Sequence, residues 1–256
     1  MDLGETEEDL LTLRGQLETL RRRLEESREG THGFVAMLAH ELRAPLGAIL
    51  MWTHVLRMGR ESDREAALDA IEKSARTQSK LIAGLLDVTR AMAGRLRIDR
   101  LPVNMAEAAR LVVEELQSEG AAPQVNLKLP RDTDGLWLLG DVLRLRQMLS
   151  ILIKGALRRA TADSGAVEIE LARAEHLIHI AIRDHGAAIS SEELGHLFEA
   201  FHMPGEPSSQ TPGLLGLELP LVRFLAELHA GTVQIRSDGS GQGSVAELKL
   251  PAVAKP

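Results

Sequence analysis

Leucine recurs along the first thirty residues at alternating intervals of three and four positions. It occupies positions 10, 13, 17, 20 and 24, and Glu and Arg fill half of the positions between them. This spacing is typical of a heptad seam, in which one apolar stripe faces a partner helix. Residues 1–30 are therefore predicted to form a parallel coiled coil that transmits a signal or dimerises the chain. A plain amphipathic helix packed on its own domain is the alternative.

Two further helices are predicted between residues 31 and 97. Apolar residues follow a helical period at positions 34, 38, 42, 46 and 49, and again at 68, 71, 75, 82 and 85, with a polar break at 59–63 between the two stretches. A helical hairpin is too thin to bury both apolar faces by itself, whereas two hairpins can form a four-helix bundle. The pattern therefore predicts a homodimer.

From residue 98 to 256 the pattern changes to helices interspersed with short alternating stretches. Helices are predicted at 105–117, 141–159 and 219–229, and strands at 125–129, 167–171, 177–182, 232–236 and 245–250. Residues 95–104, which contain a proline, are predicted to be a linker. Helices combined with hairpin-type strands indicate the α+β class, here a two-layer sandwich.

Composition narrows the possible functions. Hydrophobic residues make up 44% of the 256 and charged residues 26%, as in ordinary globular proteins. The net charge of -7 and the 2% of aromatic residues argue against nucleic-acid binding. The chain has no cysteine, which excludes disulfides and thiolate metal sites, and its histidines have no metal-ligand spacing. No apolar run is long enough to span a membrane, and no signal peptide is evident, so a cytoplasmic location is predicted.

The segment FVAMLAHELRAPL, residues 34–46, carries the most informative candidate chemistry. His40 lies on the side of the predicted helix opposite the apolar stripe, so its imidazole should face water. The neighbouring Glu41 could accept a proton from one ring nitrogen and leave the other as a nucleophile. An exposed histidine beside a glutamate is also an ordinary surface pair, and these two residues alone do not decide between the two interpretations.

The whole segment resembles the phosphoacceptor box of sensor histidine kinases, FxAxxSHELRTPL. LLDVTRAMAGRLRI, residues 85–98, is similar to the family's LLDLSRIEAGKL, and LLGDVLRLRQML, residues 138–149, is similar to VxGDPxRLRQVL at the start of its ATP-binding domain. The resemblance implies a dimer with a phosphotransfer hairpin (31–97) and an ATP-binding domain (98–256), which follow the predicted coiled-coil signalling helix (1–30). It also implies that His40 takes the γ-phosphoryl group of ATP, that Glu41 accepts the proton, and that a response-regulator aspartate receives the phosphoryl group.

Three nucleotide motifs depart from the family pattern. ILIKGALR, residues 151–158, aligns with NLLxNAxK and places Gly155 where an asparagine ligates magnesium. DHGAA, residues 184–188, keeps the Asp184 that would hold adenine and keeps Gly186, but loses the last glycine of DxGxG. LLGLEL, residues 214–219, keeps only Gly216 of GTGLGL and has Glu218 at a phosphate-binding position. A carboxylate about 5 Å from a phosphate oxygen costs roughly 3 kcal/mol at an effective dielectric of 20.

The resemblance implies ATP and magnesium as cofactors, and the departures predict that both bind poorly. Three hypotheses follow. The chain is a phosphotransferase that works through His40, supplied by an upstream partner; or an active autokinase; or a pseudokinase scaffold that binds a kinase or a response regulator. Gly155 and Glu218 favour the first hypothesis over the second, and the retained His40 and Glu41 favour the first two over the third.

Overall fold

The computed structural model describes residues 38–39, 41–59, 63–118, 125–160, 165–199, 217–237 and 243–256. Among these, one compact unit ends at Ile82 and a second begins at Ala83. The long helix α2 (Arg64–Met92) contributes to both units. The predicted coiled coil of residues 1–30 lies outside the described residues.

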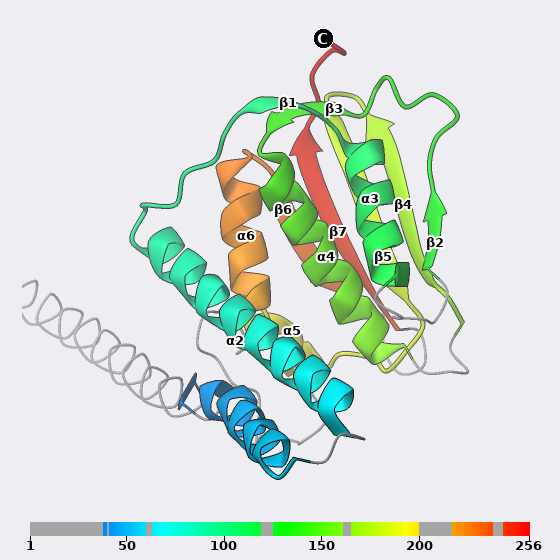
Figure 1. Ribbon diagram of the computed structural model, residues 1–256. Helices are drawn as coiled ribbons and strands as arrows, with labels where there is room; N and C mark the ends of the chain where they lie inside the picture. Colours follow the sequence, from blue (N-terminus) through cyan, green and yellow to red (C-terminus); the bar gives the residue numbers. More distant parts are fainter. Residues whose placement is uncertain are drawn as a thin grey trace, which may run out of the picture. The chain divides into compact units, whose positions relative to one another are not determined.

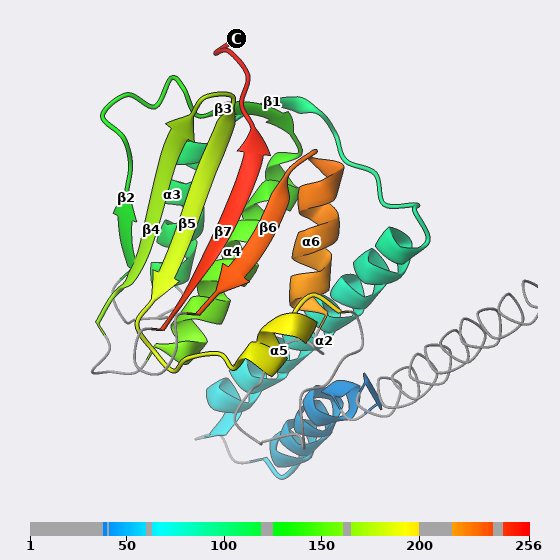
Figure 2. The same cartoon turned by 180° about the vertical axis from the view of Figure 1, so that it is seen from behind.

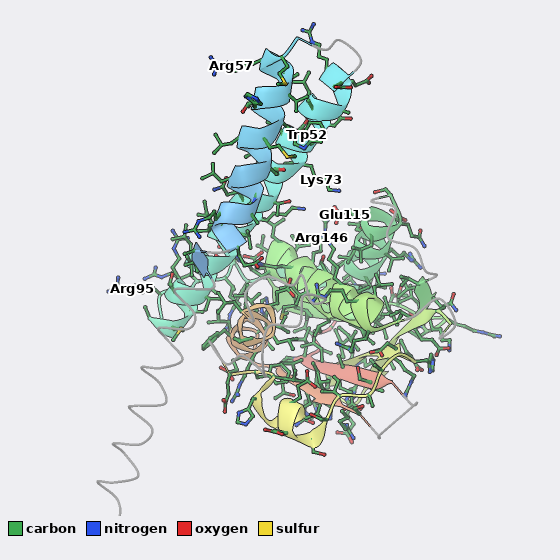
Figure 3. All side chains as sticks on the ribbon, turned by 90° about the horizontal axis from the view of Figure 1, so that it is seen from below. Trp52, Arg57, Lys73, Arg95, Glu115 and Arg146 are labelled. Atoms are coloured by element: carbon green, nitrogen blue, oxygen red, sulfur yellow. The ribbon has the colours of Figure 1, made fainter. Side chains whose placement is uncertain are left out.

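The described residues of the first unit form two helices, the first followed by a turn at 58–59, as the apolar pattern predicts. The first helix is described at residues 38–39 and 41–57 and continues through Pro45. In Figure 3 this helix, which carries Trp52 and Arg57, runs beside the part of α2 that carries Lys73. No helix in the described part of the chain is both long and apolar enough to span a membrane.

The second unit is a two-layer α+β sandwich, which confirms the predicted fold class. Its five-stranded sheet has the order β2-β4-β5-β7-β6, with β2 parallel to β4 and the other neighbours antiparallel. Three helices, α3, α4 and α6, lie on one face of the sheet, and the opposite face is open (Figures 1 and 2). The strands are β2 (Val125–Lys128), β4 (Val167–Ala174), β5 (Leu177–Asp184), β6 (Thr232–Arg236) and β7 (Ser244–Pro251), and the helices are α3 (Met105–Ser118), α4 (Val142–Arg159), α5 (Ser191–His196) and α6 (Glu218–Leu228).

The core lies between the sheet and the helices, and two different periodicities build it. Along β5, Ile178, Ile180 and Ile182 are buried at every second position because successive strand side chains point to opposite faces. Along α4, Leu145, Leu149 and Leu152 are buried at helical intervals. Full burial of one such side chain contributes about 1.5–3 kcal/mol. An ion pair between Glu115 of α3 and Arg146 of α4, both labelled in Figure 3, joins the two helices at the surface.

The predicted linker at 95–104 is partly wrong, because a strand occupies its end. Leu101–Asn104 form β1, which pairs antiparallel with β3 (Trp137–Gly140) in a separate two-stranded sheet. The side chain of Asn104 then accepts a hydrogen bond of 2.9 Å from the backbone N–H of Ala106 in the first turn of α3. A strand of four residues that includes a proline has no readable alternation, and its partner lies more than thirty positions away. Only the pairing defines it.

A buried histidine links the end of α6 to the start of α4. His229 is only 5% exposed, and its Nδ1 lies 2.7 Å from the carbonyl oxygen of Leu225. The backbone N–H of Asp141 donates to its Nε2 at 3.1 Å, while the Asp141 side chain caps α4. These contacts require a neutral ring with the proton on Nδ1, because Nε2 is an acceptor. Burial is the main cause that lowers the pKa of His229 below its ordinary value of 6.5.

This environment predicts a loss of stability in acid. The unfolded chain takes up a proton on His229 below about pH 6.5, whereas the folded chain resists protonation, so the free energy of unfolding should fall as the pH drops below that value. The contribution is at most about 1.4 kcal/mol per pH unit for one proton. Denaturant unfolding measures the free energy of unfolding between pH 7.5 and 5. This free energy should fall more steeply for the native chain than for His229→Met, because methionine has no titratable group. Equal slopes for the two proteins would contradict the prediction.

Candidate functional site

His40 and Glu41 are the residues proposed for phosphoryl transfer. His40 lies outside the described residues, and so does Gly216 of the third nucleotide motif. Glu41 is described: it is helical and half-buried. The helix that follows places it one turn before Pro45.

Asp184 is the most deeply buried charged side chain among the described residues of the second unit. It ends β5 and is 0% exposed. Its Oδ2 accepts hydrogen bonds from the hydroxyl of Ser244 at 2.6 Å and from the guanidinium of Arg159, through Nε at 3.2 Å and Nη2 at 3.0 Å. Its Oδ1 accepts a bond of 3.1 Å from the backbone N–H of Gly186. A buried carboxylate needs such partners, because an unpaired buried charge is costly.

Gly186 is needed for close approach of two backbones. A Cβ atom at this position would lie 2.0 Å from the carbonyl oxygen of Arg159 and 2.5 Å from its carbonyl carbon. The turn after β5 therefore packs directly against the end of α4. This contact keeps Arg159 beside Asp184, and it explains the glycine without any reference to a ligand.

Glu218 is the first residue of α6, and its carboxylate is paired. Arg158, the second-last residue of α4, donates to Glu218 Oε2 through Nη2 at 2.8 Å. Arg158 and Arg159 end α4, and each binds an acidic residue of another nucleotide motif. The pairing also offsets part of the repulsion expected from Glu218.

Gly155 lies on α4 beside both arginines. A Cβ atom built there would be 3.9 Å from Nη2 of Arg158 and 3.9 Å from Nη1 of Arg159. Magnesium requires oxygen ligands in near-octahedral geometry, and Gly155 has no side-chain oxygen. The residues at this position therefore do not fit a bound magnesium ion. Among the described residues, no group of three or more His, Asp or Glu side chains could hold a metal ion.

The structure brings Asp184 and Gly186 together and adds two residues that sequence reasoning missed. The sequence pattern singles out neither Arg159 nor Ser244. Ser244 could have been found from its position, because it opens the last strand and stands opposite Asp184 in the β5–β7 register. Arg159 had no local signal, since its partner is 25 positions away.

Two of the resembling stretches also meet within the second unit. Asp87, near the end of α2, is 8% exposed and forms a two-pronged ion pair with Arg144 in the first turn of α4. Arg144 also donates to Gln147 at 2.9 Å. Paired, planar contacts of this kind are among the stronger polar interactions. They attach the end of α2 to the helix that carries Gly155.

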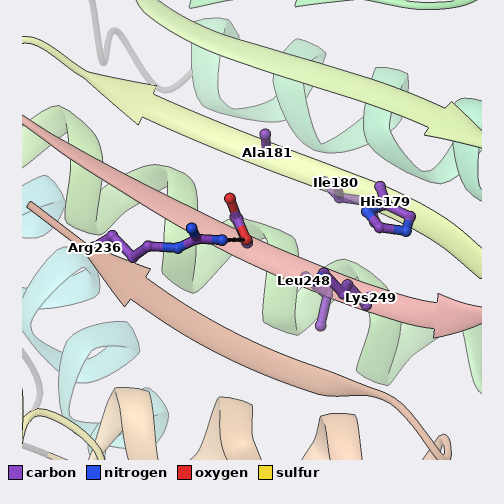
Figure 4. Close-up of a pocket in the computed structure, with 7 residues that line it drawn as sticks. His179, Ile180, Ala181, Arg236, Leu248 and Lys249 are labelled. Carbon is purple, nitrogen blue, oxygen red and sulfur yellow. Dashed lines mark hydrogen bonds and ion pairs between the residues drawn. The ribbon is translucent and has the colours of Figure 1, made fainter.

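A shallow hollow on the open face of the sheet is separate from these residues. His179, Ala181, Arg236 and Lys249 line it, and Arg236 forms an ion pair with Glu247 across it (Figure 4). His179 and Asp184 are both on β5 but at positions of opposite parity, so they face opposite sides of the sheet. The hollow is therefore not part of the Asp184 site.

Comparison with known proteins identifies the class of both regions. Residues 140–254 match the family of histidine kinase-, DNA gyrase B- and HSP90-like ATPases, so the second unit has an ATP-binding fold. Residues 31–94 match the histidine kinase A phosphoacceptor domain. A phosphoacceptor domain followed by this ATPase domain defines the sensor histidine kinases, and the chain belongs to that family.

Curated relatives agree with this assignment, and a solved structure agrees with the fold. The chain is 33% identical over 244 residues to the sensor protein GacS of Pseudomonas syringae pv. syringae, covering 92% of this chain and 27% of GacS. It is 26% identical over 250 residues to the sensor histidine kinase YkoH of Bacillus subtilis, covering 96% of this chain and 53% of YkoH. The histidine kinase AdeS of Acinetobacter baumannii has a similar fold, with a TM-score of 0.60 at 20% identity over 83% of this chain and 97% of that structure. The chain thus spans about a quarter of the length of GacS and about half of the length of YkoH.

Proposed function

We propose that this chain transfers phosphoryl groups through His40, to or from an aspartate of a response-regulator receiver domain, and that its own ATP-dependent autophosphorylation is impaired. The observation that carries the proposal is Gly155. It stands where the family has a magnesium ligand, offers no side-chain oxygen and is flanked by two guanidinium groups. The segment around His40 and Glu41, by contrast, keeps the residues that phosphoryl transfer needs.

The chemistry proposed at His40 needs no nucleotide. A ring nitrogen attacks the phosphorus of the receiver's aspartyl phosphate, the bond between phosphorus and carboxylate oxygen breaks, and the aspartate leaves as a carboxylate. Glu41 accepts the proton from the other ring nitrogen, so the phosphorylated ring stays neutral. The reverse reaction returns the phosphoryl group to a second receiver. Glu41 follows His40 directly in the chain, and its helical, half-buried position supports this role.

A homodimer is part of the proposal, and the exposed apolar side chains of the first unit support it. Leu50 is 62% exposed and Met51 56% exposed on the first helix, and Leu68 on α2 is 51% exposed. Large apolar side chains clustered on a hairpin favour association, because burial of each removes apolar surface from water. A second copy that forms a four-helix bundle would cover them. Static light scattering of the full chain should give twice the 27.9 kDa mass.

The test is to look for phosphohistidine with two different donors. The full chain is incubated with labelled ATP and magnesium, or with a panel of receiver domains phosphorylated by labelled acetyl phosphate. We expect acid-labile, base-stable label on the chain only with a phosphorylated receiver.

The other outcomes identify the alternatives. Label from ATP alone, at a rate typical of an active kinase, would establish an autokinase and contradict the impaired nucleotide site. No label from either donor, together with a stable complex with a receiver or a kinase, would establish a pseudokinase scaffold.

A further inference from the structure

Two adjacent arginines bind the acidic residues of two separate nucleotide motifs. Arg159, the last residue of α4, binds Asp184 at the end of β5, and Arg158 binds Glu218 at the start of α6. The partners are 25 and 60 positions away in the sequence. Both pairs are shielded, because Asp184 is 0% and the Glu218 side chain only 15% exposed. Shielded ion pairs are screened much less by salt than surface pairs.

Arg159 binds the carboxylate of Asp184, which by resemblance would bind the amino group of adenine. Asp184 already accepts four hydrogen bonds, from Arg159 twice, from Ser244 and from Gly186. An incoming neutral amino group would have to replace a charged donor. Removal of one partner of a buried ion pair leaves an uncompensated charge, and that exchange is unfavourable.

The Arg158 pair acts at the phosphate end of the same site. Free backbone N–H groups at a helix N-terminus favour an anion, and the cap residue Leu217 supplies no side-chain acceptor to them. Glu218 places a carboxylate in this first turn, so the chain provides its own anion there. Arg158 then balances that charge.

Gly155 provides the space for both guanidinium groups. Each lies 3.9 Å from the position of a Cβ atom at residue 155. A methyl group would only touch them, but a longer side chain would extend into them. The absence of a side chain at Gly155 and the position of the arginines therefore belong to one arrangement.

We propose that Arg158 and Arg159 hold the nucleotide site closed from within, each by an ion pair to an acidic residue of another motif. The inference rests on the proposed function, in which Asp184 recognises the base and Glu218 lies at the phosphate end. The arginine pair is an internal competitor: a nucleotide binds only after the arginines release their carboxylates.

The test is calorimetric titration of the full chain and its variants with adenosine and with ADP. Arg159→Met removes the guanidinium but keeps a long apolar side chain, and should bind both ligands at least about tenfold more tightly, since a charge-assisted hydrogen bond contributes about one decade or more. Arg159→Lys keeps a cation and should stay as weak as the native chain. Glu218→Gln should strengthen binding of ADP only, because adenosine has no phosphate. Arg223→Met, which removes an exposed arginine paired within α6, is the matched control.

Several results would overturn the proposal. One is an unchanged affinity of folded Arg159→Met for adenosine. Another is an unchanged affinity of Glu218→Gln for ADP. The Glu218→Gln variant keeps the proposal testable if Arg159→Met fails to fold. Tight binding of ADP by the native chain would also overturn it. None of these variants touches His40, so receiver-dependent labelling reports separately on phosphoryl transfer, and its failure would leave the calorimetric result interpretable.

Discussion

Substitution of His40 by glutamine is expected to abolish phosphoryl transfer from a phosphorylated receiver to this chain. Glutamine has similar size and polarity, but its amide nitrogen is not a nucleophile, because its lone pair is delocalised into the carbonyl group. The imidazole of histidine is nucleophilic when neutral. The label on the chain should fall to background, which is a complete loss and not a reduced rate.

Two further variants make this result specific. His54→Gln removes a different histidine, which is helical and exposed, and should leave labelling unchanged. Glu41→Gln keeps the nucleophile but removes the proposed proton acceptor, so labelling should slow by about 10²-fold or more, as for other general-base losses. Persistent label on His40→Gln would show that another residue accepts the phosphoryl group.

Substitution of Gly186 by alanine is expected to destabilise the second unit strongly, although it adds only one methyl group. The new Cβ atom would lie 2.0 Å from the carbonyl oxygen of Arg159, so one backbone must move away from the other. Overpacking in a close contact typically costs about 1–3 kcal/mol. The upper end is expected, because both atoms belong to backbone and neither can rotate away.

The consequences of Gly186→Ala should reach Asp184. Gly186 donates its N–H to Asp184, and the displaced end of α4 carries Arg159. Equilibrium urea unfolding measures the loss. The control is Gly195→Ala in α5, where no atom lies within 4 Å of the added Cβ. Since alanine is the better helix former by about 0.5–1 kcal/mol, this control should be neutral or slightly stabilising. A Gly186→Ala protein as stable as the native chain would contradict the close contact.

Most of the helices and strands in the second unit were readable from the sequence because they carry their own period, but the short helix α5 was not predicted. Alternate burial marks β4, β5 and β7, and helical spacing marks α4, so the predicted ranges agree with the structure within a few residues. The pair β1 and β3 was not readable. Each strand has only four residues, and its stability comes from a partner remote in the chain.

Some residues of the candidate site were likewise readable from the sequence, and others were not. The sequence by itself determined the family and the positions of His40, Glu41, Asp184 and Gly155, because these stand in stretches whose local order is characteristic. Only the tertiary structure decided what Arg158 and Arg159 do. Beside each other on α4, they could equally face water, and it is the fold that brings the end of β5 and the start of α6 to them. An ion pair depends on distance in space and burial, and neither is encoded in the spacing of residues along the chain.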